Sequence, residues 1–221
     1  MPKRLPQSPK PSRTQRNNRT AAVPSIAAGP ISRGKRIRRG DKERAPFIPP
    51  EDWYEPSPES GKSSRGFRIV EQPPGEGYRH VVSPHDLRSR LAQLPDSMLE
   101  PLEIVQLSRM TRKKEAFPCY GMQCGCAIYL YPIEASLIET FGRPPKPAEM
   151  REAQMFGGRW LQLGHTWQLI WTEATVRDFY LNNVLLHELG HLLDQRNTNY
   201  LDRERYAEWF AIEHGYRASR R

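Results

Sequence analysis

The chain has 221 residues, with 34 Lys and Arg against 25 Asp and Glu and a formal net charge of +9. This length allows one domain with a tail, or two small domains. The sequence contains neither a signal-peptide core nor an apolar run long enough to cross a membrane, which excludes an integral membrane protein and predicts a soluble, cytoplasmic one.

Residues 1–66 are predicted to form a disordered basic tail. The first 45 residues contain 13 Lys and Arg and 2 acids, a net of +11, so the rest of the chain is close to 9 − 11 = −2. Few apolar residues and many prolines leave too little surface to bury to offset the entropy of the chain. A basic cluster at 34–39 suits phosphate contacts, which makes nucleic acid or an acidic partner one expectation and solvated disorder without a partner the other. Residues 47–58 are a candidate element that docks on the domain.

Residues 67–221 are predicted to fold as one α+β domain with a small antiparallel or mixed sheet. Alternating apolar residues indicate strands, and a spacing of three to four indicates helices. In chain order we expect a strand at 67–70, a helix at 84–94 capped by Ser83, a strand at 102–107, a turn at 121–125, a β-rich run at 126–132, a helix at 148–155, a hairpin of 160–163 and 167–171, and a helix from about Glu173.

The strongest signal is His187-Glu188-Leu189-Gly190-His191, an HExxH sequence inside a run that reads as one continuous helix. At about 100° per residue, the two histidines leave the same face one turn apart and can bind one metal ion. Glu188 lies beside the first ligand, where it can take a proton from a metal-bound water. The helix is apolar on most of its surface, which predicts a buried setting, and Gly190 indicates that a neighbour packs closely there.

A catalytic zinc site usually takes a third protein ligand. Metzincins place a histidine six residues after the second one, and this chain has Asn197 there. Asp194 lies near the histidine face, so it is a candidate ligand or acceptor of an imidazole N–H, although its place also fits an ordinary residue at a helix end. Downstream, Glu204 and Glu208 share one face of a second helix that Asp202 is placed to cap.

The run Glu204–Ala211, E-x-x-A-x-x-F-A, resembles the segment that follows HExxH in the gluzincin clan of metallopeptidases, in particular the small soluble ImmA/IrrE-type peptidases. The resemblance covers residues 165–217 and implies a zincin-like fold with one Zn²⁺. It assigns three zinc ligands (His187, His191 and Glu204), a general base (Glu188) and an acceptor that orients a ligand histidine (Glu208). From the residues alone, Glu204 also fits an acid attracted to a helix N-terminus, and Glu208 a surface partner of Arg205.

The sequence therefore predicts a zinc-dependent metalloendopeptidase acting on a protein or peptide. In such peptidases the substrate backbone pairs with an exposed sheet edge near the metal, and residues 127–131 or 166–171 are the two candidate edges. Four residues are candidate donors to the oxyanion, and none is assigned: Tyr200, Tyr206, His165 and His214. The alternative is a nucleic-acid or partner-binding protein that works through its basic tail, with the zincin-like domain as a scaffold of little turnover.

Three cysteines, Cys119, Cys124 and Cys126, form a C-x4-C-x-C group around the predicted turn. With His80 or His85 as a fourth ligand they would hold a second metal, and ordinary thiols are the simpler expectation. An odd number of cysteines in an intracellular chain disfavours a structural disulfide.

Overall fold

The computed structural model describes residues 66–116 and 119–221. The predicted tail, its candidate docking element at 47–58 and its expected binding to nucleic acid or an acidic partner lie outside the described residues, apart from Gly66. No helix in the described part is both long enough and apolar enough to cross a bilayer.

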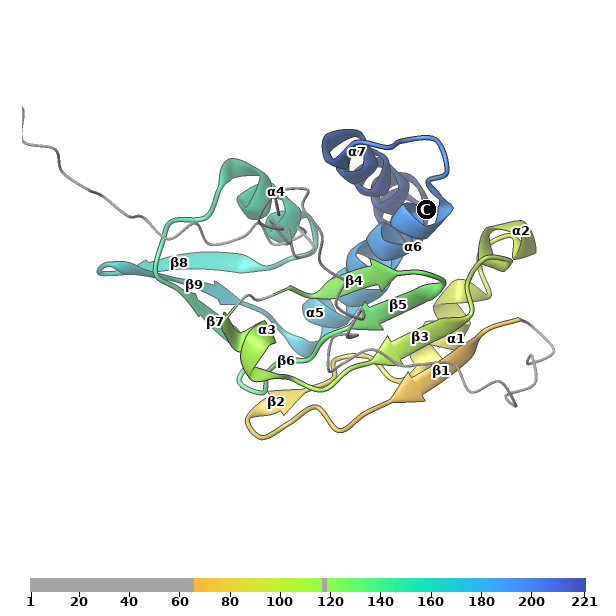
Figure 1. Ribbon diagram of the computed structural model, residues 1–221. Helices are drawn as coiled ribbons and strands as arrows, with labels where there is room; N and C mark the ends of the chain where they lie inside the picture. Colours follow the sequence, from red (N-terminus) through yellow and green to blue (C-terminus); the bar gives the residue numbers. More distant parts are fainter. Residues whose placement is uncertain (1–65, 117–118) are drawn as a thin grey trace, which may run out of the picture.

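The described chain forms an α+β domain whose largest sheet has four strands (Figure 1). Their order is β1 (Arg68–Glu71), β3 (Ile104–Leu107), β5 (Ala127–Leu130) and β4 (Gly121–Cys124). The first three strands are parallel, and β4 pairs antiparallel with β5. The prediction of a small mixed sheet is therefore confirmed.

The predicted turn at 121–125 is wrong over most of its length, because this stretch is the edge strand β4. The turn itself comprises only Gly125 and Cys126, with Cys124 paired to Ala127 across the hairpin. Gly125 has φ +57°, a conformation that glycine adopts without strain and that two-residue hairpin turns require.

Two smaller sheets complete the β structure of the described residues. One pairs β2 (Tyr78–Arg79) with β6 (Ile133–Glu134), and the other has the order β7 (Ile138–Phe141), β9 (Thr166–Ile170) and β8 (Arg159–Leu163). The hairpin predicted at 160–163 and 167–171 is confirmed as β8 and β9.

Both predicted substrate edges are wrong, because each lies in the interior of a sheet. Residues 127–131 contain β5, which is flanked by β3 and β4, and residues 166–171 contain β9, which is flanked by β7 and β8. The four-stranded sheet ends instead at β4, and this strand contacts the HExxH helix.

Five of the seven α-helices in the described residues lie where the sequence predicts helix and differ from the prediction at their ends, whereas the two short ones at 96–99 and 112–116 are not predicted. They are α1 (Pro84–Leu91), α2 (Asp96–Leu99), α3 (Arg112–Ala116), α4 (Pro147–Met155), α5 (Glu173–Phe179), α6 (Leu185–Leu193) and α7 (Tyr200–Phe210). The Ser83 cap of α1 is confirmed, since its side chain accepts from the backbone N–H of Asp86. The predicted cap of α7 is wrong: Asn199 caps the helix by accepting from the N–H of Asp202, which lies inside the first turn.

The continuous helix predicted around HExxH is present, with a π-helical segment, η1 (Tyr180–Val184), between α5 and α6. A second π-helical segment, η2 (Ala211–Arg217), follows α7 and ends in the short 3₁₀ helix η3 (Ala218–Arg220). The two π-helical segments pack against each other closely. A Cβ at Gly215 would lie 1.8 Å from the carbonyl oxygen of Asn182, so only glycine fits there.

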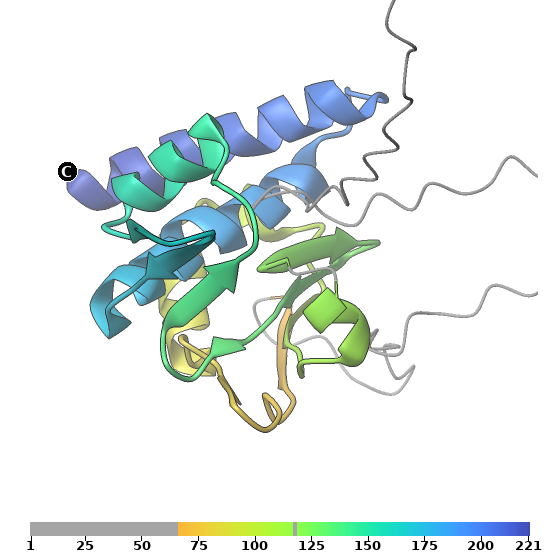
Figure 2. The same ribbon diagram turned by 90° about the vertical axis from the view of Figure 1, so that its left-hand side faces the viewer.

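The core lies between the four-stranded sheet and the helix that carries HExxH. Leu185, Leu186 and Leu189 of α6 are fully buried, which confirms the predicted setting. Helix α7 runs beside α6 (Figure 2). A Cβ at Gly190 would lie 2.9 Å from the Cα of Ala207, so this glycine lets the two helices approach, as the sequence indicated.

Candidate metal centre and active site

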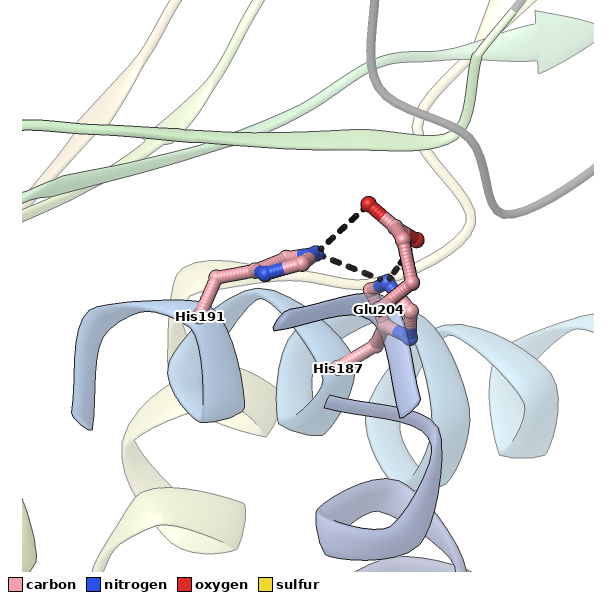
Figure 3. Close-up of side chains that lie close together, drawn as sticks. All are labelled: His187, His191 and Glu204. Carbon is pink, nitrogen blue, oxygen red and sulfur yellow. Dashed lines mark hydrogen bonds and ion pairs between the residues drawn. The ribbon is translucent and has the colours of Figure 1, made fainter. Parts of the chain in front are cut away.

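Helices α6 and α7 bring three side chains together at one point (Figure 3). The Nε2 atoms of His187 and His191 are 3.1 Å apart. A carboxylate oxygen of Glu204 lies 3.6 Å from the Nε2 of His187, and the other lies 3.4 Å from the Nε2 of His191. All three ligand atoms lie within 4.8 Å of one another, so the group could hold one metal ion.

The two histidines differ in their affinity for protons. Burial lowers the pKa of His187, but the hydrogen bond to Glu204 and the charge of Glu188 outweigh it and leave the pKa raised. Burial and the charge of His187 lower the pKa of His191 to about 4. The lowered pKa favours the neutral form of His191, which is the form that binds a metal, whereas a metal has to displace a proton more often from His187.

Glu188 is buried between α6 and β4, with 5% of its surface exposed. Burial raises its pKa to about 7, against the opposing charge of His187 and a hydrogen bond from the backbone N–H of Gln123. Gly121 of β4 makes room for this side chain, because a Cβ there would lie 2.8 Å from the Cγ of Glu188 and 2.8 Å from the Cγ1 of Val184. The sequence does not indicate this role, since it predicts a turn at Gly121.

A small cleft opens beside Glu188 and encloses about 10 Å³, enough for one water-sized group. Its walls come from the segment just before β4 and from β4, α4, α5, η1 and α6. The lining residues are Cys119, Tyr120, Gly121, Glu152, Phe179, Asn183, Val184, His187 and Glu188. Sequence reasoning missed Glu152 and Asn183, whose side chains are linked: the Nδ2 of Asn183 donates to Oε1 of Glu152. The one available signal was the position of Asn183, one turn before His187 on the same helix.

The other predicted site residues lie outside the metal group. The carboxylate of Asp194 accepts hydrogen bonds from the backbone N–H groups of Arg196 and Asn197, so it stabilises the turn after α6. Glu208 is exposed, and no described residue donates a hydrogen bond to it. Their roles toward a ligand histidine stay predictions.

Of the four candidate oxyanion donors, Tyr200 contacts a residue of the metal group. Burial raises its pKa, and so do the charge of Glu204 and the hydrogen bond that the Tyr200 hydroxyl donates to this carboxylate. The rings of Tyr206 and His214 pack on Phe210 instead. His165 lies in the turn between β8 and β9.

The three cysteines are free thiols, in agreement with the prediction against a disulfide. Within 66–116 and 119–221, His187, His191 and Glu204 form the one group of metal-binding side chains, so the cysteines do not assemble a second site with His80 or His85. The Sγ of Cys119 accepts a hydrogen bond of 3.3 Å from the Nζ of Lys114.

Comparisons with protein-family models, with curated proteins and with solved structures yield no match for this chain. The gluzincin resemblance therefore stays a prediction, and the function is inferred from the geometry of the site.

Proposed function

We propose that the protein is a zinc-dependent metallopeptidase with a zincin-like domain. The observation that carries this proposal is the convergence of His187, His191 and Glu204 beside a buried carboxyl group, that of Glu188. Three converging ligands without an acid–base group beside them would fit a structural metal site equally well. The adjacent Glu188 supplies the acid–base group that hydrolysis needs.

The donor set suits zinc. Two imidazole nitrogens and one carboxylate are a common ligand set of catalytic zinc sites, which leave a fourth position open. When bound there, zinc would lower the pKa of a coordinated water and polarise the carbonyl of the scissile bond. His187 and His191 approach this point from one turn of α6, and Glu204 closes it from α7.

Glu188 would act first as a base and then as an acid. A carboxyl group whose pKa is about 7 exchanges its proton readily at neutral pH, so it can take a proton from water and give it to the leaving amine. The N–H of Gln123 and the close contact with Gly121 hold the carboxylate on the side of α6 that faces β4.

The substrate backbone would extend along β4. Within the described residues this strand pairs with β5 on one side, and its other side ends the sheet. Because β4 also contacts α6, a peptide added antiparallel or parallel to this edge would pass beside Glu188. The Tyr200 hydroxyl, already directed at Glu204, would be a donor to the oxyanion.

The proposal is tested by incubating the zinc-loaded protein with a diverse peptide library and identifying new termini by mass spectrometry. We expect cleavage that a chelator abolishes and that added zinc restores. The same preparation of Glu188→Gln serves as the matched control, because it keeps the shape of the side chain and removes the base. A wild-type protein that takes up no zinc after metal supplementation would contradict the proposal.

A further inference from the structure

We propose that the cleft beside Glu188 binds a primary ammonium group of the substrate, and that Glu152 of α4 is the residue that recognises it. The ammonium group belongs to a residue next to the scissile bond, either as its free α-amino group or as the end of a lysine side chain. This inference rests on the proposed function, since it names the class of substrate for the same site.

The size of the cleft restricts what it can hold. It encloses about 10 Å³, the room of one water. An ammonium group has a single non-hydrogen atom, as water has, whereas the guanidinium group of arginine is a rigid plane of several. The cleft therefore admits a primary ammonium group and excludes a guanidinium group.

The polar groups that line the cleft are mainly hydrogen-bond acceptors. Glu152 and Glu188 contribute carboxylates, and the Tyr120 hydroxyl donates its hydrogen to Glu139. Asn183, with only 8% of its surface exposed, donates from its Nδ2 to Oε1 of Glu152, and within the described residues its Oδ1 accepts no hydrogen bond. An ammonium group has three N–H donors and no acceptor, which matches this lining, whereas a water is both donor and acceptor and has no charge.

Glu152 differs in its partner from Glu149, the other acid of α4. Glu149 is paired with Arg143, whose Nη1 and Nη2 atoms each donate to it at 2.7 Å. Glu152 is paired with the neutral amide of Asn183, and no Lys or Arg nitrogen of the described residues lies within 4.0 Å of its carboxylate. Burial raises the pKa of Glu152 and makes an unpaired carboxylate costly there, so a cation from the substrate would stabilise it.

The place of the cleft determines which part of a substrate Glu152 meets. His187 and Glu188 line the same cleft, so an ammonium group held there lies beside the point at which the peptide bond would be cut. Asn183 lies one turn before His187, and its hydrogen bond ties the Glu152 carboxylate to the helix that carries HExxH. The recognised group therefore belongs to a residue that flanks the scissile bond.

The first experiment measures kcat/KM of the zinc-loaded wild type on versions of a peptide identified in the library experiment. The residue beside the scissile bond is lysine, arginine or norleucine, and each version has a free or an acetylated N-terminus. We expect removal of the ammonium group, by acetylation or by norleucine, to lower kcat/KM roughly 10- to 100-fold, the loss typical of a hydrogen bond to a charged group.

The same peptides separate the two sources of the ammonium group. A loss on acetylation, with cleavage after the first residue, would identify the α-amino group. A loss with norleucine and with arginine, and cleavage beside an internal lysine, would identify the side chain. Either result supports the inference.

The variant Glu152→Gln tests the residue itself, because it keeps the shape of the side chain and removes its charge. The ratio of kcat/KM between the peptides with and without the ammonium group should fall roughly 10- to 100-fold, to a value close to one. This ratio is insensitive to a general loss of activity. Glu100→Gln, an exposed acid that follows α2, is the control and should keep the ratio of the wild type.

A binding experiment tests the cleft without turnover. Methylammonium chloride is titrated into the zinc-loaded ¹⁵N-labelled protein, and the side-chain amide signal of Asn183 is followed in ¹H–¹⁵N spectra. The signal should shift with a dissociation constant of about 10 to 100 mM, since so small a ligand binds weakly. Tetramethylammonium chloride, which has the same charge, no N–H group and a larger size, should leave the signal in place.

An Asn183 signal that methylammonium does not move would overturn the inference. So would kcat/KM values within about threefold of each other for peptides with and without the ammonium group, or an arginine accepted as well as the recognised lysine. These wild-type measurements decide even if Glu152→Gln does not fold. A protein that binds no zinc, or that cleaves no peptide when loaded, would instead refute the proposed function, and the methylammonium titration would still test the cleft.

Discussion

Two regions of this molecule hold a carboxyl group whose pKa burial raises to about 7. One is the contact between α6 and β4, which holds Glu188. The other is the contact between β7 and the end of β9, which holds Glu139. The Oε2 of Glu139 accepts hydrogen bonds from the Tyr120 hydroxyl at 2.7 Å and from the Trp171 indole N–H at 3.1 Å.

The two carboxyl groups have a similar raised pKa, but their surroundings differ. Glu188 adjoins His187 of the candidate metal group and lines the cleft, whereas Glu139 accepts hydrogen bonds from two neutral donors within the aromatic core. In both regions burial is the largest cause of the raised pKa, so a raised pKa does not by itself mark a catalytic group. The position of the carboxyl group relative to the metal ligands, and not its pKa, identifies the catalytic candidate.

The largest expected difference between the regions is in turnover. Glu188→Gln should lower kcat/KM at least about 1,000-fold, because it removes the base, while zinc content stays at the wild-type value. Glu139→Gln should leave kcat/KM within about threefold of the wild type. Both values are measured on a peptide identified in the library experiment. Comparable losses of kcat/KM in the two variants would show that position relative to the metal group does not distinguish Glu188 from Glu139.

The second largest expected effect is on zinc content. It should depend on the region that holds Glu188 and the metal group, and not on the region that holds Glu139. His191→Ala and Glu204→Ala should each weaken zinc binding more than about 100-fold, beyond the loss expected for a residue that only supports a ligand. Glu139→Gln, in the other region, should keep the zinc of the wild type. Elemental analysis of the purified variants measures the zinc content per chain. Zinc retained by Glu204→Ala would point to Asp194 or Glu208 as the third ligand.

A third prediction tests whether β4 fixes Glu188. The Cβ of Gly121→Ala would lie 2.8 Å from the Cγ of Glu188, closer than a Cβ contact allows. The carboxylate has to move, and a displacement of about 1 Å lowers activity roughly 100-fold. Zinc content should not change. Gly142→Ala is the matched control, since no described atom lies within 4 Å of a Cβ there, and full activity of Gly121→Ala would exclude this role of β4.

The smallest effect concerns Glu139 and the dependence of stability on pH. Its pKa is about 7 in the folded protein and 4.5 in the unfolded reference, so the folded state binds the extra proton between these values. The resulting stabilisation is complete below pH 4.5 and is lost as the pH rises through 7, by at most about 3 kcal/mol.

Urea unfolding from pH 4.5 to 8 measures this loss. Glu139→Gln should flatten the fall in the free energy of unfolding over that range, and Glu100→Gln should leave it unchanged. If Glu139→Gln showed the same fall in the free energy of unfolding with pH as the wild type, burial of the Glu139 carboxyl group would not be the cause of that fall.

The parts of the site that the sequence predicted are those encoded locally. The spacing of His187 and His191 on one helix depends only on helical geometry, and Glu204 follows on the next helix. Gly121 and Glu152 were missed because the contact of Gly121 with α6 and that of Glu152 with η1 are tertiary. Nothing in the local pattern around either residue indicates which element it will face.

The secondary structure shows the same difference between features that are encoded locally and features that depend on tertiary contacts. The strands β8 and β9 were recognised from their alternation and the turn between them, and α4 from its spacing. The sequence predicts a turn at β4 because this strand has a glycine, a glutamine and a cysteine where apolar alternation would indicate a strand. The two substrate edges were wrong because strand order in a sheet follows from packing across the whole domain.

The helical hairpin of α6 and α7 has a consequence for the order of folding. All three metal-group residues belong to it, and only the short turn between Leu193 and Tyr200 separates the two helices. Closing so short a loop costs little entropy, whereas the contact of β4 with Glu188 joins two segments that are far apart in sequence. If the proposed function holds, we therefore expect a nascent chain to assemble its metal group before Glu188 is in place, so that it stays inactive until β4 has packed on α6.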